Sequence, residues 1–89
     1  MPKVIFASHV QRHVSAPDIV VEGSTVRSAL DAVFADNRPL RGYVLDDQGH
    51  LRKHVVIFVD GARVVDREGL SDSVAPDSEI YVLQALSGG

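Results

Sequence analysis

The chain has 89 residues, of which 45% are hydrophobic and 24% charged, the composition of a soluble globular protein with one modest core. Its net charge of −3 disfavours nucleic-acid binding, and the absence of cysteine excludes disulfides, zinc–thiolate sites, iron–sulfur clusters and a cysteine nucleophile. No segment has the length and apolarity of a membrane span, and the N-terminus lacks a signal-peptide core. We therefore expect a cytoplasmic protein that binds neither membranes nor nucleic acid.

Two strands are predicted near the N-terminus. The first is expected over Lys3–Val14, where alternating residues share one face: Val4, Phe6, Ser8 and Val10. Phe6 is the expected core anchor of this strand. Turn residues at 15–18 separate it from the β-branched run Ile19–Val21, which we expect to pair with it as a hairpin.

The main helix is predicted to begin after a polar turn, with Ser24 as the N-cap and Thr25 as the alternative. Apolar residues then recur at the spacing of one helical face: Val26, Ala29, Leu30, Val33 and Phe34. Because Pro39 is incompatible with a helix interior, the helix should end near Asp36 or Asn37.

Residues 38–53 form a mixed connection between the helix and the next strand. Four apolar residues in it predict a second short helical turn under the sheet: Leu40, Tyr43, Val44 and Leu45. Asp46–Gly49 has the composition of a turn, because Asp favours turns and Gly permits a left-handed backbone.

Three more strands are predicted in the second half of the chain: His54–Val59, Ala62–Val65 and Glu79–Leu86. Asp60-Gly61 is a strong hairpin signal between the first two. In the polar loop Asp66–Ser78, Leu70 and Val74 are expected to contact the core. The order of elements predicts an α+β fold, with one main helix packed across a mixed sheet and the first and last strands parallel at its centre.

Two pairs of residues suggest metal ligands, but neither pair completes a site. His9 and His13 have a spacing that suits ligation on a helix, whereas the strand pattern favours two solvated histidines. Asp46 and Asp47 lie in a turn that lacks the pattern of an EF-hand loop. We predict no metal site, and no triad, phosphate-binding loop or paired acidic cleft indicates a catalytic site.

The last predicted strand is followed by a short tail that ends in Gly88-Gly89. Two closing glycines occur by chance in about one chain in 200. The α-carboxylate of Gly89, with a reference pKa of roughly 3.5, is ionised at neutral pH. From Leu86 to Gly89 the extended tail reaches about 13 Å, enough to enter the active site of a partner. An inert, frayed end is the alternative.

Four motifs carry a resemblance to a known family: Gly23–Arg27, Gly49–Arg52, Val56–Gly61 and Glu79–Gly89. On these motifs the chain resembles the β-grasp, ubiquitin-like sulfur carriers of the MoaD/ThiS type. That group includes the small subunit of molybdopterin synthase, the thiamine sulfur carrier and carriers that serve cysteine synthesis. The chain departs from the family pattern at turn and strand-edge positions, namely Asp60, Asp77-Ser78 and Gln84, which leaves the pathway open.

The resemblance implies a single β-grasp domain over 1–89 with a flexible tail at 87–89. A ubiquitin-activating-like partner would adenylate the Gly89 carboxylate, using ATP and magnesium that the partner binds. A sulfur donor would convert it to a thiocarboxylate for an acceptor synthase in molybdopterin, thiamine or cysteine synthesis. The partner's channel would hold Leu86, Ser87 and Gly88, and a docking surface would include Phe58, Tyr81 and Arg52. The chain itself would be no enzyme and would bind no cofactor.

Two other classes of function remain open on the sequence. One is a protein modifier joined to lysines through Gly89, which would produce isopeptide conjugates. The other is a non-catalytic interaction subunit with an inert Gly-Gly pair, which would still form its complex after Gly88 and Gly89 are removed.

Overall fold

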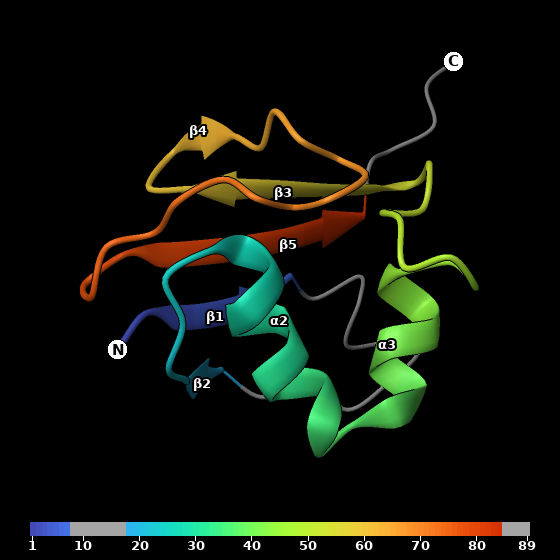
Figure 1. Cartoon of the computed structure of the whole chain (residues 1–89), viewed down its shortest axis with the longest axis horizontal. Coiled ribbons are helices and arrows are strands. Elements are labelled where there is room, and N and C mark those ends of the chain that lie inside the picture. The colour runs from blue at the N-terminus through green and yellow to red at the C-terminus, as the bar shows by residue number, and fades with distance from the viewer. Residues whose placement is uncertain (8–17, 85–89) are drawn as a thin grey trace.

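The computed structural model describes residues 1–7 and 18–84. Within them, the elements follow in this order: β1 (Lys3–Phe6), β2 (Ile19–Val20), α2 (Val26–Ala35), α3 (Arg38–Val44), β3 (Val55–Val59), β4 (Ala62–Arg63) and β5 (Glu79–Gln84). The strands form one layer and the two helices lie against it (Figure 1). This arrangement confirms the predicted α+β layout with one main helix across a mixed sheet.

The strands described form a sheet in the order β2-β1-β5-β3-β4. β1 and β5 are parallel, with Phe6 opposite Val82, while β3 lies antiparallel to β5 on its other side. The prediction that the first and last strands lie parallel at the centre is therefore confirmed. β2 pairs antiparallel with β1, as the hairpin prediction required.

Helix α2 buries the face that its periodicity predicted: Val26, Ala29, Leu30, Val33 and Phe34 are all buried. Its N-cap is Thr25, the predicted alternative, so the preference for Ser24 was wrong. Thr25 Oγ1 accepts a hydrogen bond from the backbone N–H of Ser28 at 3.1 Å, and the Thr25 N–H donates to Ser28 Oγ at 3.1 Å. This reciprocal pair places the N-cap at Thr25, because only the residue three before Ser28 makes both bonds.

The predicted second helical turn is the seven-residue helix α3. Pro39 occupies its first turn, where the missing N–H would have no helical partner in any case. The side chain of Asn37 caps this helix by accepting from Leu40 N at 3.3 Å. Leu40 and Val44 are buried, so α3 extends the core beyond the end of α2.

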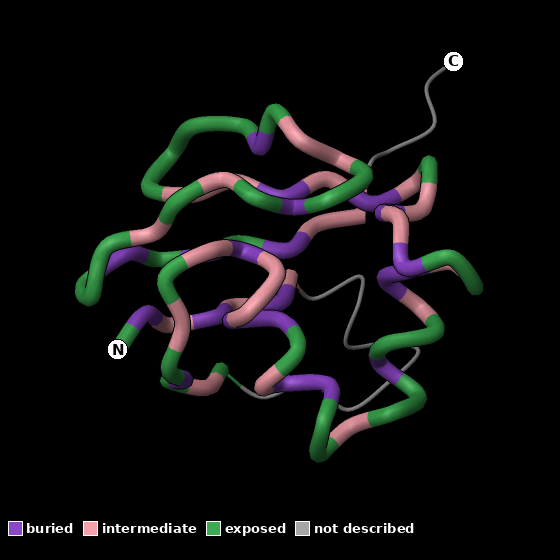
Figure 2. The backbone as a smooth tube through the Cα atoms, in the orientation of Figure 1, coloured by how far each residue is buried: buried purple, intermediate pink, exposed green. Residues whose placement is uncertain are grey.

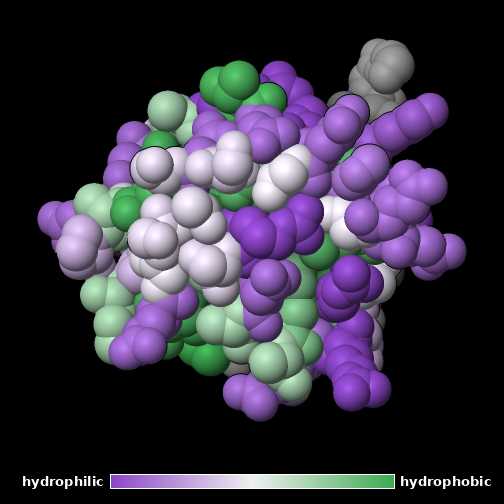
Figure 3. Space-filling model, in the orientation of Figure 1, coloured by the Kyte–Doolittle hydropathy of each residue, from purple (hydrophilic) through white to green (hydrophobic). Residues whose placement is uncertain are grey.

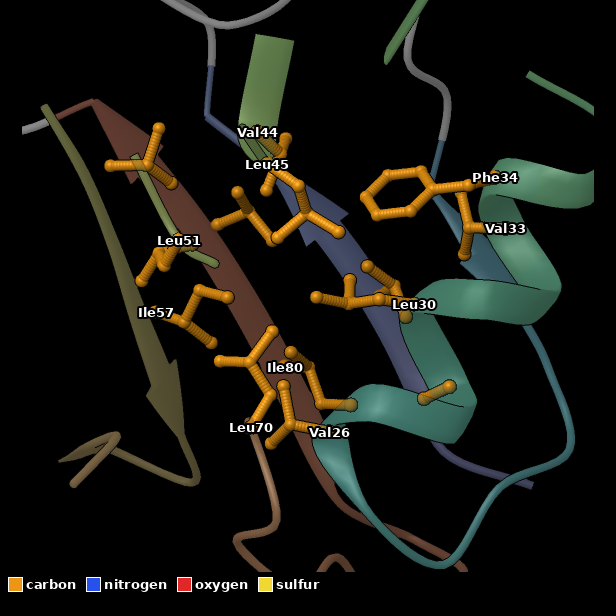
Figure 4. Close-up of a cluster of buried hydrophobic side chains, with 14 of the residues drawn as sticks. Val26, Leu30, Val33, Phe34, Val44, Leu45, Leu51, Ile57, Leu70 and Ile80 are labelled. Carbon is orange, nitrogen blue, oxygen red and sulfur yellow. The ribbon is translucent and has the colours of Figure 1, made fainter. Parts of the chain in front are cut away.

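The core lies between the helices and one face of the sheet (Figure 4). The buried, purple residues of Figure 2 alternate with exposed residues along β5 and with half-buried ones along β1 and β3, as expected for a sheet that is covered on one side. In the loop between β4 and β5, Leu70 is fully buried and Val74 packs against the core, which confirms both predicted contacts.

The Asp60-Gly61 turn was predicted as a hairpin and is confirmed as one, with φ of 50° at Asp60 and 86° at Gly61. The Asp60 carboxylate also fixes the start of β5, because it accepts from Glu79 N at 2.9 Å and from Ser78 Oγ at 2.8 Å. The Glu79 N–H, and after it the Ser78 hydroxyl, lower the pKa of the Asp60 carboxyl.

Several strand boundaries differ from the predictions. β3 begins at Val55 rather than at His54, and β4 ends at Arg63 rather than at Val65. β4 is short because the residue after the buried Val64 no longer pairs with β3: the Val65 N–H donates to Asp72 Oδ2 at 3.0 Å instead. β1 is described to Phe6, and the predicted continuation through Ser8, His9, Val10 and His13 lies outside the described residues.

Candidate functional site

Strand β5 places the last described residue of the chain, Gln84, at one end of the sheet. Gln84 is opposite Val55 of β3, so the chain leaves β5 beside the start of β3 and the connection from α3 (Figure 1). The predicted tail residues Leu86, Ser87, Gly88 and Gly89 lie outside the described residues. Their roles stay predictions.

The face of the sheet opposite the helices carries a row of apolar side chains. Tyr81 is the central residue of this row, paired with Ile5 of β1 on one side and with Phe58 of β3 on the other. Tyr81 is 37% exposed, and both neighbours are half-buried. Directly opposed side chains lie about 5 Å apart, so these three form a continuous strip.

A second apolar pair extends this strip toward the end of β5. Leu83 is opposite Val56 in the register, and both are half-buried. We call the five residues together the open face: Ile5, Val56, Phe58, Tyr81 and Leu83. Three charged residues border it in the same register, namely Lys3, Glu79 and Arg63. An apolar patch with a charged border is typical of a protein–protein contact surface.

The predicted docking residues thus divide into two groups. Phe58 and Tyr81 are neighbours on the open face. Arg52 lies outside the sheet, in the connection before β3, and its Nε donates to the carbonyl oxygen of Gly42 at 2.8 Å. The Arg52 carbonyl accepts from the Arg67 guanidinium at 2.9 Å. Arg52 therefore joins α3 to this connection and contributes a cation near the end of the sheet from which the chain leaves.

The side of the molecule formed by α3 and its following connection is hydrophilic (Figure 3). Exposed charged residues there include Arg38, Arg41, Asp47 and Lys53. The turn at Asp46 is confirmed, because its Oδ1 accepts from Gln48 N at 2.9 Å and His50 N at 3.0 Å. The His50 N–H lowers the pKa of the Asp46 carboxyl, although partial desolvation opposes that shift.

Gln84 itself is held by a residue from α3. Tyr43 Oη donates to Gln84 Oε1 at 2.8 Å, and the Tyr43 ring meets the His54 ring edge-on with centroids 5.5 Å apart. The end of β5 is thus in contact with β3 through its backbone register and with α3 through Tyr43. Tyr43 was expected only as an apolar residue of the helical turn, so its polar contact was missed.

The sequence signals for these missed residues differ in strength. Val56 and Leu83 could have been found, because each lies two residues along its strand from a predicted docking residue, Phe58 or Tyr81, and so shares its face. Ile5 has no such signal, because it joins the open face only through its pairing with Tyr81. The contact between Tyr43 and Gln84 spans 41 residues and has no local signal.

The described residues offer no metal-ligand cluster and no membrane-spanning helix. That part of the chain holds no group of three or more histidine, cysteine, aspartate or glutamate side chains placed to bind a metal ion. His9 and His13 lie outside it. None of the helices in residues 18–84 is long and apolar enough to cross a membrane.

No protein-family model and no curated protein sequence matches the chain. Solved structures do share its architecture. SAMP1 from Haloferax volcanii is 23% identical, with 99% of this chain and 98% of that chain covered and a TM-score of 0.77. A chain of the BexX/CysO complex from Amycolatopsis orientalis is 19% identical over the full length of both chains, with a TM-score of 0.82.

A third likeness agrees with these two. CysO from Mycobacterium tuberculosis is 19% identical, with 97% of this chain and all of that chain covered and a TM-score of 0.80. The chain has the β-grasp fold. At these identities the likeness concerns the fold, and within the β-grasp fold the open face and the end of β5 form the candidate site.

Proposed function

We propose that this β-grasp protein is a sulfur carrier, activated at the Gly89 carboxylate by a partner enzyme. The observation that carries the proposal is the position of β5. This strand lies between β1 and β3 at the centre of the sheet and is followed within five residues by Gly88-Gly89. A central strand gives the tail a fixed origin, and two glycines give it a narrow end.

The chemistry of the proposal takes place at the tail and needs no catalytic side chain on this protein. A Gly89 carboxylate oxygen attacks the α-phosphorus of ATP, and pyrophosphate leaves to give an acyl-adenylate. Hydrosulfide then attacks the acyl carbon, and AMP leaves with the original carboxylate oxygen. The product is a thiocarboxylate, which an acceptor synthase consumes. The adenylating partner supplies ATP and magnesium.

The open face is the proposed contact with that partner. Its apolar strip is centred on Tyr81, and its charged border matches the polar rim of a typical interface. Arg52 lies nearer the end of β5 and is proposed to contact the partner beside the entrance for the tail. A partner that covers the open face also determines where the tail begins relative to its own active site.

The names of the similar structures are consistent with this class of function. One is a CysO protein recorded in a complex with BexX, and another is a small archaeal modifier protein, SAMP1. The second name favours an alternative function, a modifier that is conjugated to lysine side chains through Gly89. Both functions begin with adenylation and differ in the product, a free thiocarboxylate or an isopeptide conjugate.

The test is adenylation of tail variants by the activating enzyme of the same organism, measured as ATP–pyrophosphate exchange. Gly88→Val adds a β-branched side chain to the tail, and one residue added after Gly89 moves the carboxylate by about 3.5 Å. Misplacement by about 1 Å can cost on the order of 100-fold in rate. We expect both variants to melt within about 0.5 kcal/mol of the parent and to lose activation. Exchange at the parental rate in either variant would refute the assignment of Gly88 and Gly89.

A further inference from the structure

The hydrogen bond between Tyr43 and Gln84 joins the end of β5 to a helix on the other side of the core. Its two ends are 41 residues apart in sequence, and the donor-to-acceptor distance is 2.8 Å. Both side chains are half-buried. A partly buried hydrogen bond between neutral groups holds its partners in one geometry at a modest gain in free energy.

The position of Tyr43 is itself determined by its surroundings. Its ring packs against the core and meets the His54 ring at an interplanar angle of 85°. The neighbouring residue Val44 is fully buried, and the carbonyl of Gly42 on its other side accepts from Arg52 at 2.8 Å. The Tyr43 hydroxyl is therefore presented to Gln84 from a fixed helix.

We propose that Tyr43 is a positioning residue, which holds Gln84 and so sets the direction in which the chain leaves β5 toward the partner's active site. The inference rests on the proposed function and deepens it, because it names a residue distant from Gly89 that acts on the same step. Tyr43 touches neither ATP nor the reacting carboxylate and acts through Gln84 alone.

The physical reason is the number of conformations that are open to the end of β5. A backbone residue that is released from its fixed conformation gains several accessible states, and each added state lowers the fraction of tails aimed at the active site. Loss of one hydrogen bond of ordinary strength changes such a fraction by about two- to tenfold. The open face is unchanged by that loss, so docking should keep its affinity while turnover falls.

Four variants and a control test the inference. Tyr43→Phe removes the hydroxyl and keeps the ring against His54, and Gln84→Leu removes the acceptor. The double variant completes a cycle, because two changes that break one interaction are not additive. Gln84→Glu has an acceptor oxygen that Gln84→Leu lacks, so it should keep the activity that Gln84→Leu loses. Ser78→Ala is the matched control, since it removes two hydrogen bonds at the opposite end of β5.

Two measurements are made on the full-length protein. The first is kcat and KM for adenylation by the activating enzyme. The second is amide hydrogen exchange at Leu83 and Gln84, which requires no partner. We expect Tyr43→Phe, Gln84→Leu and the double variant to lower kcat by a similar two- to tenfold, to leave KM within twofold, and to speed exchange at the end of β5. Gln84→Glu and Ser78→Ala should keep the parental kcat, although Ser78→Ala should melt at a lower temperature than the parent.

The outcomes that would overturn the inference are distinct from those that overturn the proposed function. A parent that is adenylated while Tyr43→Phe matches it in kcat and in exchange would refute the positioning role alone. An equal fall in kcat for Ser78→Ala would also refute it, because the effect would then follow stability. A parent that is never adenylated would refute the proposed function and, with it, a role for Tyr43 in activation.

Discussion

Tyr81→Ala should weaken docking on the activating enzyme without unfolding the protein. Tyr81 is the centre of the open face and is 37% exposed. An aromatic side chain of about 200 Å² therefore offers roughly 75 Å² to a partner, which is worth about 2 kcal/mol at 25 cal/mol per Å². That free energy corresponds to a rise of about 30-fold in KM, since each 1.36 kcal/mol is a factor of ten. Loss of the cross-strand pairs with Ile5 and Phe58 should cost about 0.2–1 kcal/mol each, so the variant stays folded.

The assay is initial-rate adenylation at varied carrier concentration, with a thermal melt of each variant by circular dichroism. Val65→Ala is the matched control, because Val65 is 88% exposed but lies in the loop after β4, outside the sheet. Its KM should remain within twofold of the parent. If Tyr81→Ala melts cooperatively and also keeps the parental KM, the open face is not the docking surface and the reasoning from exposure and register fails.

Three further predictions concern stability and its dependence on pH. Phe34→Ala should cost about 3–5 kcal/mol of unfolding free energy in urea titrations, because Phe34 is 3% exposed; a cost below about 1 kcal/mol would contradict its place in the core. Gly23→Ala should destabilise by about 1–3 kcal/mol, since its Cβ would lie 2.8 Å from Ala29 N, whereas Gly42→Ala meets nothing within 4 Å and should stabilise α3 by about 0.5–1 kcal/mol. The Ser71 hydroxyl and the Gly69 N–H lower the pKa of the Asp66 carboxyl from 3.8 to about 2. A lowered native pKa stabilises the fold above pH 3.8, and this stabilisation is lost as the pH falls toward 2. The melting temperature of the parent should therefore drop more steeply over that range than the melting temperature of Asp66→Asn.

Local patterns in the sequence predicted the elements well. The face of α2 followed from its spacing, and the hairpin at Asp60-Gly61 followed from a dipeptide that tolerates positive φ. The parallel pairing of β1 with β5 followed from the crossover that the helix makes between them. Each of these features depends on residues that are near one another in the chain or on a general rule of topology.

Features that depend on one particular side-chain hydrogen bond, whether local or between distant residues, were not predictable in the same way. The N-cap is Thr25 rather than Ser24 because Ser28 completes a reciprocal pair with it. β4 ends before Val65 because Asp72 accepts a hydrogen bond from Val65 N. The contact of Tyr43 with Gln84 exists only after α3 has packed beside the end of β5. For the candidate site, Phe58 and Tyr81 were expected on a docking surface from the family resemblance, and the register of β3 with β5 is what makes them neighbours.

The most direct test of the central claim is the intact mass of the carrier after incubation with its activating enzyme, ATP, magnesium and hydrosulfide. We predict a mass shift of one oxygen-to-sulfur exchange, located at Gly89 by fragmentation, and no shift when ATP is left out. A mass that never changes, while the same enzyme shows no ATP–pyrophosphate exchange on this chain, would contradict the proposed sulfur-carrier function.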